Sequence, residues 1–112
     1  MFENLELLRM SHALAVHAGT RQSILAGNVA HANTPGYQRR DLRPFTELYD
    51  PTRRDQVFEA FTPNATESPN GNTVSVEREI MYTAEVRRDH EMALSIYKSS
   101  LDILRTSLGR RG

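Results

Sequence analysis

Proline is unevenly distributed along this 112-residue chain, and this distribution limits the regular structure that the chain can form. The stretch from 38 to 72 contains four of the five prolines, and the fifth is Pro35. The stretch from 75 to 108 lacks both proline and glycine. Because proline breaks helices and glycine weakens them, long helices can form only before and after the middle region.

We therefore expect a mainly α-helical fold, in which long N- and C-terminal helices pack as a coiled-coil-like pair. The chain is short enough for one domain, 1–112. We place an N-terminal helix over 1–33, a turn and loop region over 34–72, and a C-terminal helix over 73–112. Ser75 is a candidate N-cap, and little or no β structure is expected beyond a possible short strand over 56–61.

Composition limits the function classes. The chain is 38% apolar, has no tryptophan or cysteine, and has a formal net charge of zero. It therefore forms no disulfides, and nothing in its charge demands a polyanionic partner. The first residues are acidic and no cleavable signal is recognisable. No run approaches the ~20 apolar residues of a membrane span.

Heptad spacing in the C-terminal stretch predicts a coiled-coil seam, because seven of ten positions in two rows are apolar or aromatic. The first row contains Val76, Thr83, His90, Tyr97 and Leu104, and the second contains Ile80, Arg87, Leu94, Leu101 and Leu108.

The two helices carry more apolar surface than one helix pair can cover. Met81, Met92, Ile96 and Ile103 form an additional flank, and small residues recur every fourth position in the first helix. A monomer seldom leaves so much apolar surface in water. A self-contained antiparallel hairpin is the alternative. We expect the following residues to contact other subunits: Leu5, Leu8, Ala15, Val29, Ile80, Leu94, Tyr97, Leu101, Leu104 and Leu108.

Catalytic and metal-binding patterns are not apparent. No two of the four histidines have the spacing of helical metal ligands, and there is no Gly-x-Ser-x-Gly elbow or glycine-rich phosphate loop. We expect no enzyme, no metal and no cofactor. Arg39, Arg40 and Arg43 form a local basic patch, but nearby acidic residues favour a protein contact or a solvated turn over nucleic acid.

The segment that ends the first helix has strong turn chemistry. Pro35 presets the backbone for the second position of a turn, and Gly36 can adopt the positive φ that a type II turn requires next. Asn33 tolerates the left-handed conformation that ends helices. The segment therefore predicts a helix stop followed by a fixed corner between Thr34 and Tyr37.

This segment resembles the N-terminal signature of bacterial flagellar rod, hook and filament-junction proteins, with His31 in place of the usual asparagine. The matching positions are Asn28, Val29, Ala30, Thr34, Pro35, Gly36 and Tyr37. The string from Asn70 to Val74 is similar to the C-terminal pattern of the proximal rod members. The candidate motif and turn residues are Asn28, Ala30, Asn33, Thr34, Pro35, Gly36 and Tyr37.

The resemblance implies a structural subunit of the flagellar basal-body rod that assembles helically and transmits torque. It also implies self-association, contact with other rod subunits and with membrane-ring or export-gate adaptor proteins, and type III export to the periplasmic rod without a cleaved signal. Another proximal rod subunit of the same family is an alternative. A cytoplasmic helical adaptor or a nucleic-acid-associated protein is the alternative from a different class.

Overall fold

The computed structural model describes residues 2–109 and is mainly helical, as predicted. Helix α1 spans Phe2–Ala30, the short helix α2 spans Phe45–Leu48, and α3 spans Val76–Gly109. Ser75 lies directly before α3, where its Oγ accepts a hydrogen bond from the Arg78 backbone N–H at 3.4 Å. It therefore acts as the expected N-cap.

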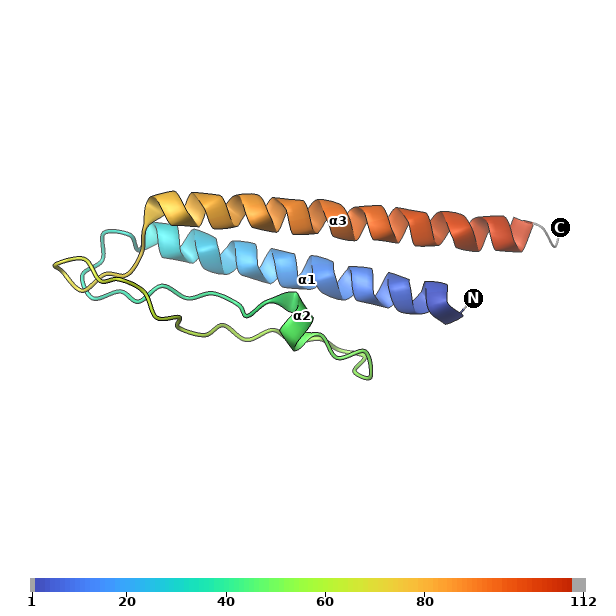
Figure 1. Cartoon of the computed structure of the whole chain (residues 1–112), viewed down its shortest axis with the longest axis horizontal. Coiled ribbons are helices and arrows are strands. Elements are labelled where there is room, and N and C mark those ends of the chain that lie inside the picture. Colours follow the sequence, from blue (N-terminus) through green and yellow to red (C-terminus); the bar gives the residue numbers. More distant parts are fainter. Residues whose placement is uncertain (1, 110–112) are drawn as a thin grey trace.

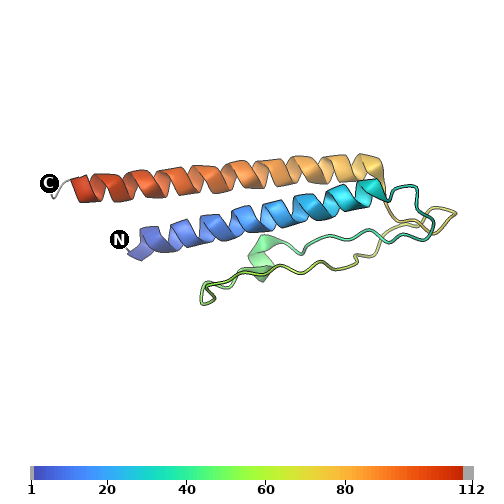
Figure 2. The ribbon, with the colours of Figure 1, turned by 180° about the vertical axis from the view of Figure 1, so that it is seen from behind.

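The two long helices form an antiparallel hairpin in a molecule that measures 67 × 25 × 16 Å. The described ends of the chain lie at one end of the hairpin, and the turns that connect the elements lie at the other (Figure 1). The central region runs along α1, so that α1 lies between α3 and the irregular segments (Figure 2). The helices diverge toward the end that carries both termini (Figure 1).

Small side chains allow α1 and α3 to approach each other closely. The buried residues of α3 are spaced by seven, at Glu79, Val86, Ala93 and Ser100. On α1, Ser11, Ala18 and Leu25 are buried with the same spacing. Ala18, Leu25 and Val86 form one core cluster, against which Tyr82 packs. This pattern is a heptad seam in which most side chains are small.

The seam with α1 lies one residue before the second predicted heptad row. Leu94 and Ile80 belong to that row, and they are 46% and 64% exposed. Longer side chains at the seam would hold the helix axes apart, whereas alanine and serine let the helices approach. The predicted rows therefore lie mostly outside the hairpin, although Leu101 and Leu104 are half-buried.

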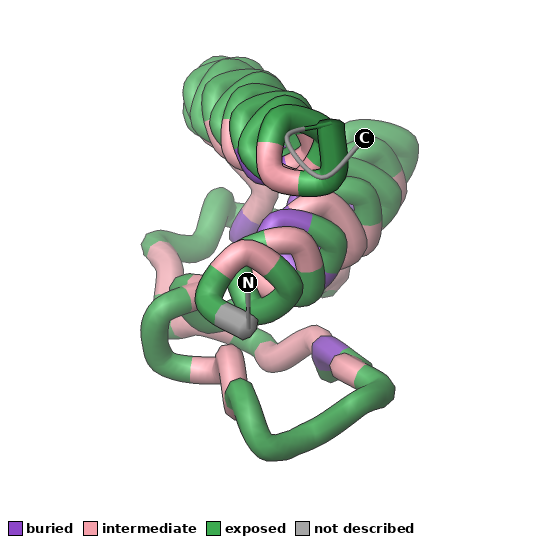
Figure 3. Tube along the Cα trace, turned by 90° about the vertical axis from the view of Figure 1, so that its right-hand side faces the viewer, coloured by how far each residue is buried: buried purple, intermediate pink, exposed green. Residues whose placement is uncertain are grey.

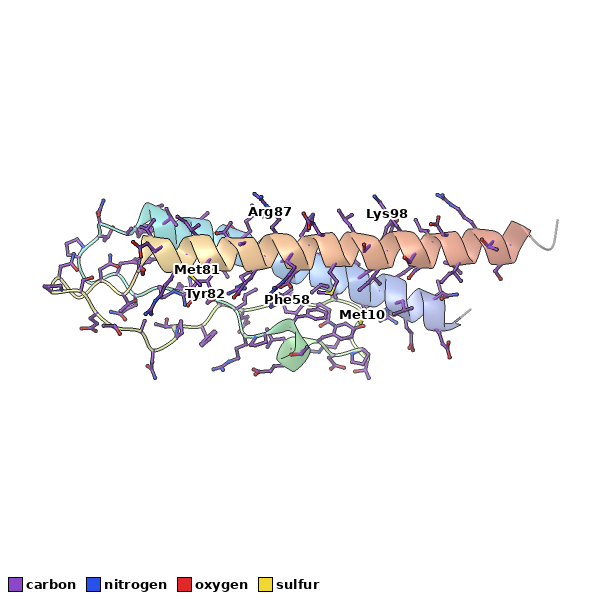
Figure 4. The ribbon with its side chains drawn as sticks, turned by 45° about the horizontal axis from the view of Figure 1, so that its top comes forward. Met10, Phe58, Met81, Tyr82, Arg87 and Lys98 are labelled. Atoms are coloured by element: carbon purple, nitrogen blue, oxygen red, sulfur yellow. The ribbon has the colours of Figure 1, made fainter. Side chains whose placement is uncertain are left out.

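The central region packs on α1 through aromatic side chains rather than through a sheet. His17 of α1 makes edge contacts with Phe58 and Phe45, at centroid distances of 5.0 and 5.7 Å. The side chain of Phe58 lies between the helices and the irregular segment that carries it (Figure 4). The possible strand over 56–61 does not form, because only one antiparallel bridge connects Asp41 and Phe61. The expectation of little or no β structure is confirmed.

Enlarging a seam residue should be more harmful than shortening its exposed neighbour. We expect Ala93→Leu to lower the free energy of unfolding by about 1–3 kcal/mol, because Ala93 is only 2% exposed at the contact between the helices and a larger side chain there would push them apart. Leu94→Ala should change it by less than about 0.5 kcal/mol. Urea unfolding followed by circular dichroism measures both values. Equal effects would contradict the observed seam.

Candidate functional site

The predicted corner is present and has the geometry of a type II turn. The Tyr37 backbone N–H donates to the Thr34 carbonyl at 3.2 Å, and Gly36 has a φ of 75°. Helix α1 ends earlier than expected, at Ala30. The predicted left-handed conformation at Asn33 is wrong, because positive φ occurs only at glycines among the described residues. A hydrogen-bonded turn that starts at His31 ends the helix instead.

A second turn packs directly against this corner. Gly71 also has a positive φ, 83°, and a Cβ atom there would lie 3.4 Å from the Gly36 Cα. The Gly36 N–H donates to the Asn70 carbonyl at 2.9 Å. The Asn72 side-chain amide donates to the carbonyls of His31 and Thr34 at 2.9 and 2.7 Å. These contacts join the end of α1 to the start of α3, and we call the two turns together with Asn72 the clasp.

Asn28, the first residue of the motif, connects α1 to the chain that leaves the clasp. Its side chain is fully buried, donates to the Arg40 carbonyl at 2.7 Å and accepts from the Arg40 N–H at 3.0 Å. The Tyr37 hydroxyl also donates to Asn28 Oδ1, at 3.4 Å, and the Tyr37 ring stacks on His31. Asn28 therefore holds residues 37–44, which we call the first extended segment, against the last turn of α1.

Five charged side chains form an ionic cluster beside the clasp: Arg21, Arg39, Asp41, Glu79 and Glu85. Arg39 Nε donates to Glu79 Oε1 at 2.7 Å, and its Nη2 donates to Asp41 Oδ2 at 3.1 Å. Arg21 bridges Asp41 at 2.8 Å and Glu85 at 3.1 Å. The cluster thus joins α1, the first extended segment and α3.

Tyr82 completes the cluster on one side. The guanidinium carbons of Arg39 and Arg21 lie 4.8 and 5.4 Å from its ring centroid, within range of cation–π attraction. Figure 4 shows Tyr82 pointing from α3 toward the irregular segments.

The electrostatics favour the charged form of these groups. Burial alone would lower the pKa of Arg39, but hydrogen bonds to Glu79 and Asp41 outweigh it and raise the pKa above its ordinary value. Burial alone would raise the pKa of Asp41, but hydrogen bonds from Arg21, from the Leu42 backbone N–H and from Arg39 lower the pKa below its ordinary value. Each charged group in the cluster has a partner of opposite sign, so the arrangement is suited to holding elements together.

Sequence reasoning missed most of the ionic cluster. Arg39 was assigned to a basic surface patch, yet it is buried and paired, and Arg43 lies over the Phe61 ring. Glu79 was not predicted to be buried, because the predicted seam rows did not contain it and consisted mainly of large apolar residues. The available signal was its seven-residue spacing from Val86 and Ala93, which places it on the buried row.

The structure brings together only some of the residues expected to contact other subunits. Ala15, Leu94 and Tyr97 line a groove of about 300 Å³ between α1 and α3, together with Ser11, His12 and Ala93. Leu8, Leu101 and Leu104 are half-buried. The remainder are exposed and divide between the two ends of the hairpin.

We name the two exposed apolar groups by their place. The terminal-end group is Leu5, Leu7, Ile103 and Leu108, and the clasp-end group is Val29, Val76, Ile80 and Met81. Figure 3, which looks at the molecule from the terminal end, shows mainly exposed and half-buried residues in the nearest turns of both helices. Within the described range, neither long helix combines the length and apolar character that crossing a membrane requires.

Removing the carboxylate at position 79 should weaken the fold. We expect Glu79→Gln to lower the free energy of unfolding by about 3 kcal/mol, because Arg39 would keep its charge in a buried site without its main partner. Glu85→Gln is the matched control, since the Glu85 side chain is 46% exposed, and its effect should stay below about 1 kcal/mol. Chemical denaturation of the purified chain measures both changes.

Acid should weaken the fold through Asp41. Because its pKa is lower in the folded than in the unfolded chain, its contribution is complete above about pH 4 and is lost as the pH falls through the folded-state pKa. Asp41→Asn should therefore reduce the slope of stability against pH in this range. Some slope should remain, because hydrogen bonds from Thr52 also lower the pKa of Asp50. An unchanged slope would contradict the assignment.

Comparison with known proteins gives a consistent result. No protein-family model matches the chain. The chain is 32% identical over 100 residues to the flagellar basal body rod protein FlgB of Escherichia coli strain K12, covering 67% of this chain and 72% of that protein. It is 33% identical over 96 residues to FlgB of Aquifex aeolicus, covering 75% and 77%. It is 25% identical over 116 residues to FlgB of Agrobacterium fabrum, covering 85% of this chain and 87% of that protein.

These similarities extend over most of each protein. They also agree with the predicted resemblance to proximal rod members. The chain therefore belongs to the FlgB family of flagellar basal body rod proteins.

Proposed function

We propose that this chain is a structural, non-enzymatic subunit of the proximal rod, that it assembles helically with other rod subunits, and that the assembly transmits torque. One observation carries the proposal. The seam between α1 and α3 consists largely of small side chains, whereas many large apolar side chains point outward.

The exposed apolar surface is large for a chain of this size. Among the residues that the structure describes, twelve large hydrophobic side chains are exposed, and all but Val57 lie on α1 or α3. Soluble monomers rarely expose large contiguous apolar patches unless these are binding sites. The exposed residues include Met92 on one flank of α3 and Leu94 and Tyr97 on another, which supports contacts with more than one neighbour. A helical assembly needs such different faces, because its contacts are heterologous.

The clasp and the ionic cluster support the mechanical part of the proposal. They connect α1, the first extended segment and α3 through buried hydrogen bonds and ion pairs at the same end of the hairpin. Removing one partner of a buried ion pair typically costs about 3–5 kcal/mol, which supports a strong attachment of the first extended segment to α3 at this end. A subunit that keeps its helices together under load can pass torque to its neighbours.

The proposed partners are other rod subunits and adaptor proteins of the membrane ring or export gate. The resemblance of the motif and the names of the FlgB relatives support a place in the basal-body rod. We also propose type III export without a cleaved signal. The proposal also includes the single domain expected from the sequence. It includes subunit contacts at the residues expected to make them: Leu5, Leu8, Ala15, Val29, Ile80, Leu94, Tyr97, Leu101, Leu104 and Leu108.

A charge placed in the groove tests the proposal. We expect Leu94→Asp to leave the helicity and stability of the purified chain nearly unchanged, because Leu94 is exposed there. In the source bacterium, with the native gene replaced, the variant should be missing from isolated basal bodies and motility should be lost, since a charge would be buried against a neighbouring subunit.

Ser95→Asp is the matched control. Ser95 is exposed, adjacent in sequence and on the side of α3 away from the groove, so the same charge should be tolerated there. If Leu94→Asp subunits entered basal bodies in normal amounts and supported swimming, the groove would not be an assembly surface and the proposal would lose its main support.

A further inference from the structure

We infer that Asn70 is a site of spontaneous deamidation whose rate the clasp controls. The closed clasp keeps Asn70 unreacted, whereas a chain whose clasp is open converts this residue to aspartate and isoaspartate. Asn70 and Gly71 form the only Asn-Gly pair in the sequence, and the Asn70 side chain is exposed in the second turn of the clasp. The co-reactant is water.

The reaction needs no group from outside the turn except that water. The Gly71 backbone nitrogen attacks Asn70 Cγ, the bond from Cγ to Nδ2 breaks, and the proton of the attacking nitrogen leaves with the amide as ammonia. Water then opens the resulting five-membered imide. Addition at Cγ gives aspartate, and addition at the backbone carbonyl carbon gives isoaspartate. Glycine after asparagine favours ring closure, because no Cβ restricts its backbone or obstructs the attack.

Hydrogen bonds in the closed clasp oppose this reaction. The Gly71 N–H donates to the Ser68 carbonyl at 2.8 Å, and Asn70 Oδ1 accepts from the Asn72 N–H at 3.1 Å. The nitrogen of the imide carries no hydrogen, so ring closure must give up the bond to Ser68. It must also move the Asn70 side chain away from its present acceptor position. The reaction therefore proceeds from the open turn, and its rate follows the fraction of molecules in which the turn is open.

The turn is kept closed by contacts from outside it. Asn72 is 2% exposed, and its side chain donates to the carbonyls of His31 and Thr34 at the end of α1. The Asn70 carbonyl accepts from the Gly36 N–H at 2.9 Å. Opening the turn thus requires its separation from the first corner, at the end of the hairpin where both turns lie (Figure 1). Protection of Asn70 depends on the attachment between α1 and α3 rather than on local sequence.

The two products affect the clasp differently. Aspartate keeps the length of the main chain, and its carboxylate can accept the Asn72 N–H as a charged acceptor, which strengthens a hydrogen bond. Isoaspartate adds one methylene to the main chain and displaces the carbonyl that accepts the Gly36 N–H. A Cβ built on Gly71 already lies 3.4 Å from the Gly36 Cα, so the lengthened turn does not fit there. A chain that stays open long enough therefore loses the ability to close its clasp.

Mass spectrometry of aged protein tests the control by the clasp. The full-length chain is incubated at mildly alkaline pH, either folded or unfolded in guanidinium chloride. Trypsin then releases one peptide, 55–78, because it cuts after Arg54 and Arg78. We expect deamidation of Asn70 to be at least about tenfold slower in the folded chain. Asn64 and Asn72 lie in the same peptide as internal controls and should stay unreacted in both samples.

A variant that opens the clasp without changing the Asn-Gly pair tests the cause. Asn72→Ala removes the bonds to His31 and Thr34, and Asn70 should react severalfold faster in this folded variant than in the native chain. Asn64→Ala, at an exposed asparagine outside the clasp, is the matched control and should leave the rate unchanged. Circular dichroism shows whether each variant folds. If Asn72→Ala does not fold, hydrogen exchange of the native Gly71 N–H replaces it, and folding should slow exchange and deamidation by the same factor.

The products are compared after chromatographic separation of the aged chains. We expect Asn70→Asp to unfold at nearly the denaturant concentration of the native chain, and the isoaspartate chain to unfold at a clearly lower one. Three results would overturn the inference: equal deamidation rates in folded and unfolded chains, no reaction at Asn70 in the unfolded chain, or an isoaspartate chain as stable as the native one.

Discussion

The buried pairing of Arg39 with Glu79 is the interaction on which the arrangement of the chain depends. A fully buried carboxylate on a helix requires a charged partner, and the partner comes from neither long helix but from the segment that leaves the first turn. That segment reaches α3 only because the corner at Gly36 turns the chain back and Asn28 holds it against α1. The ion pair between Arg39 and Glu79 therefore depends on both the turn at Gly36 and the hydrogen bonds of Asn28.

The seam of small side chains has consequences on both sides of the hairpin. Inside, serine and alanine allow close helix contact but bury little apolar area, so the seam alone contributes modestly to stability. The ionic cluster adds stabilising contacts at the clasp end, and the aromatic contacts of His17 add them along α1. Outside, the large apolar side chains remain available to neighbours.

Local rules sufficed to predict the helices and the corner. Proline positions bound the helices, and Pro35 followed by Gly36 defines a type II turn without information from the remainder of the chain. The seam could not be predicted in this way. Either Leu94 or Ala93 could face α1 on the basis of the local sequence, and the distance between the two helices determines which one does. Nothing in the local sequence distinguishes Asp41, Glu79 and Asn72 from exposed polar residues. Their contacts form only when folding brings three distant segments together. The division of the exposed residues between the two ends likewise depends on antiparallel pairing.

The loop tip at residues 51–55, which follows α2, has a consequence for how such a chain can change in length. Residues 51–55 are all exposed, and the turn is held at its base, where the Gln56 side-chain amide donates to the carbonyls of Asp50 and Arg53. Exposed loop tips tolerate inserted sequence well. Because this tip lies far from the clasp (Figure 1), an additional domain could be inserted there while α1, α3 and their ionic cluster kept their present geometry. The hairpin can thus accept inserted domains of different size without a change in its own packing.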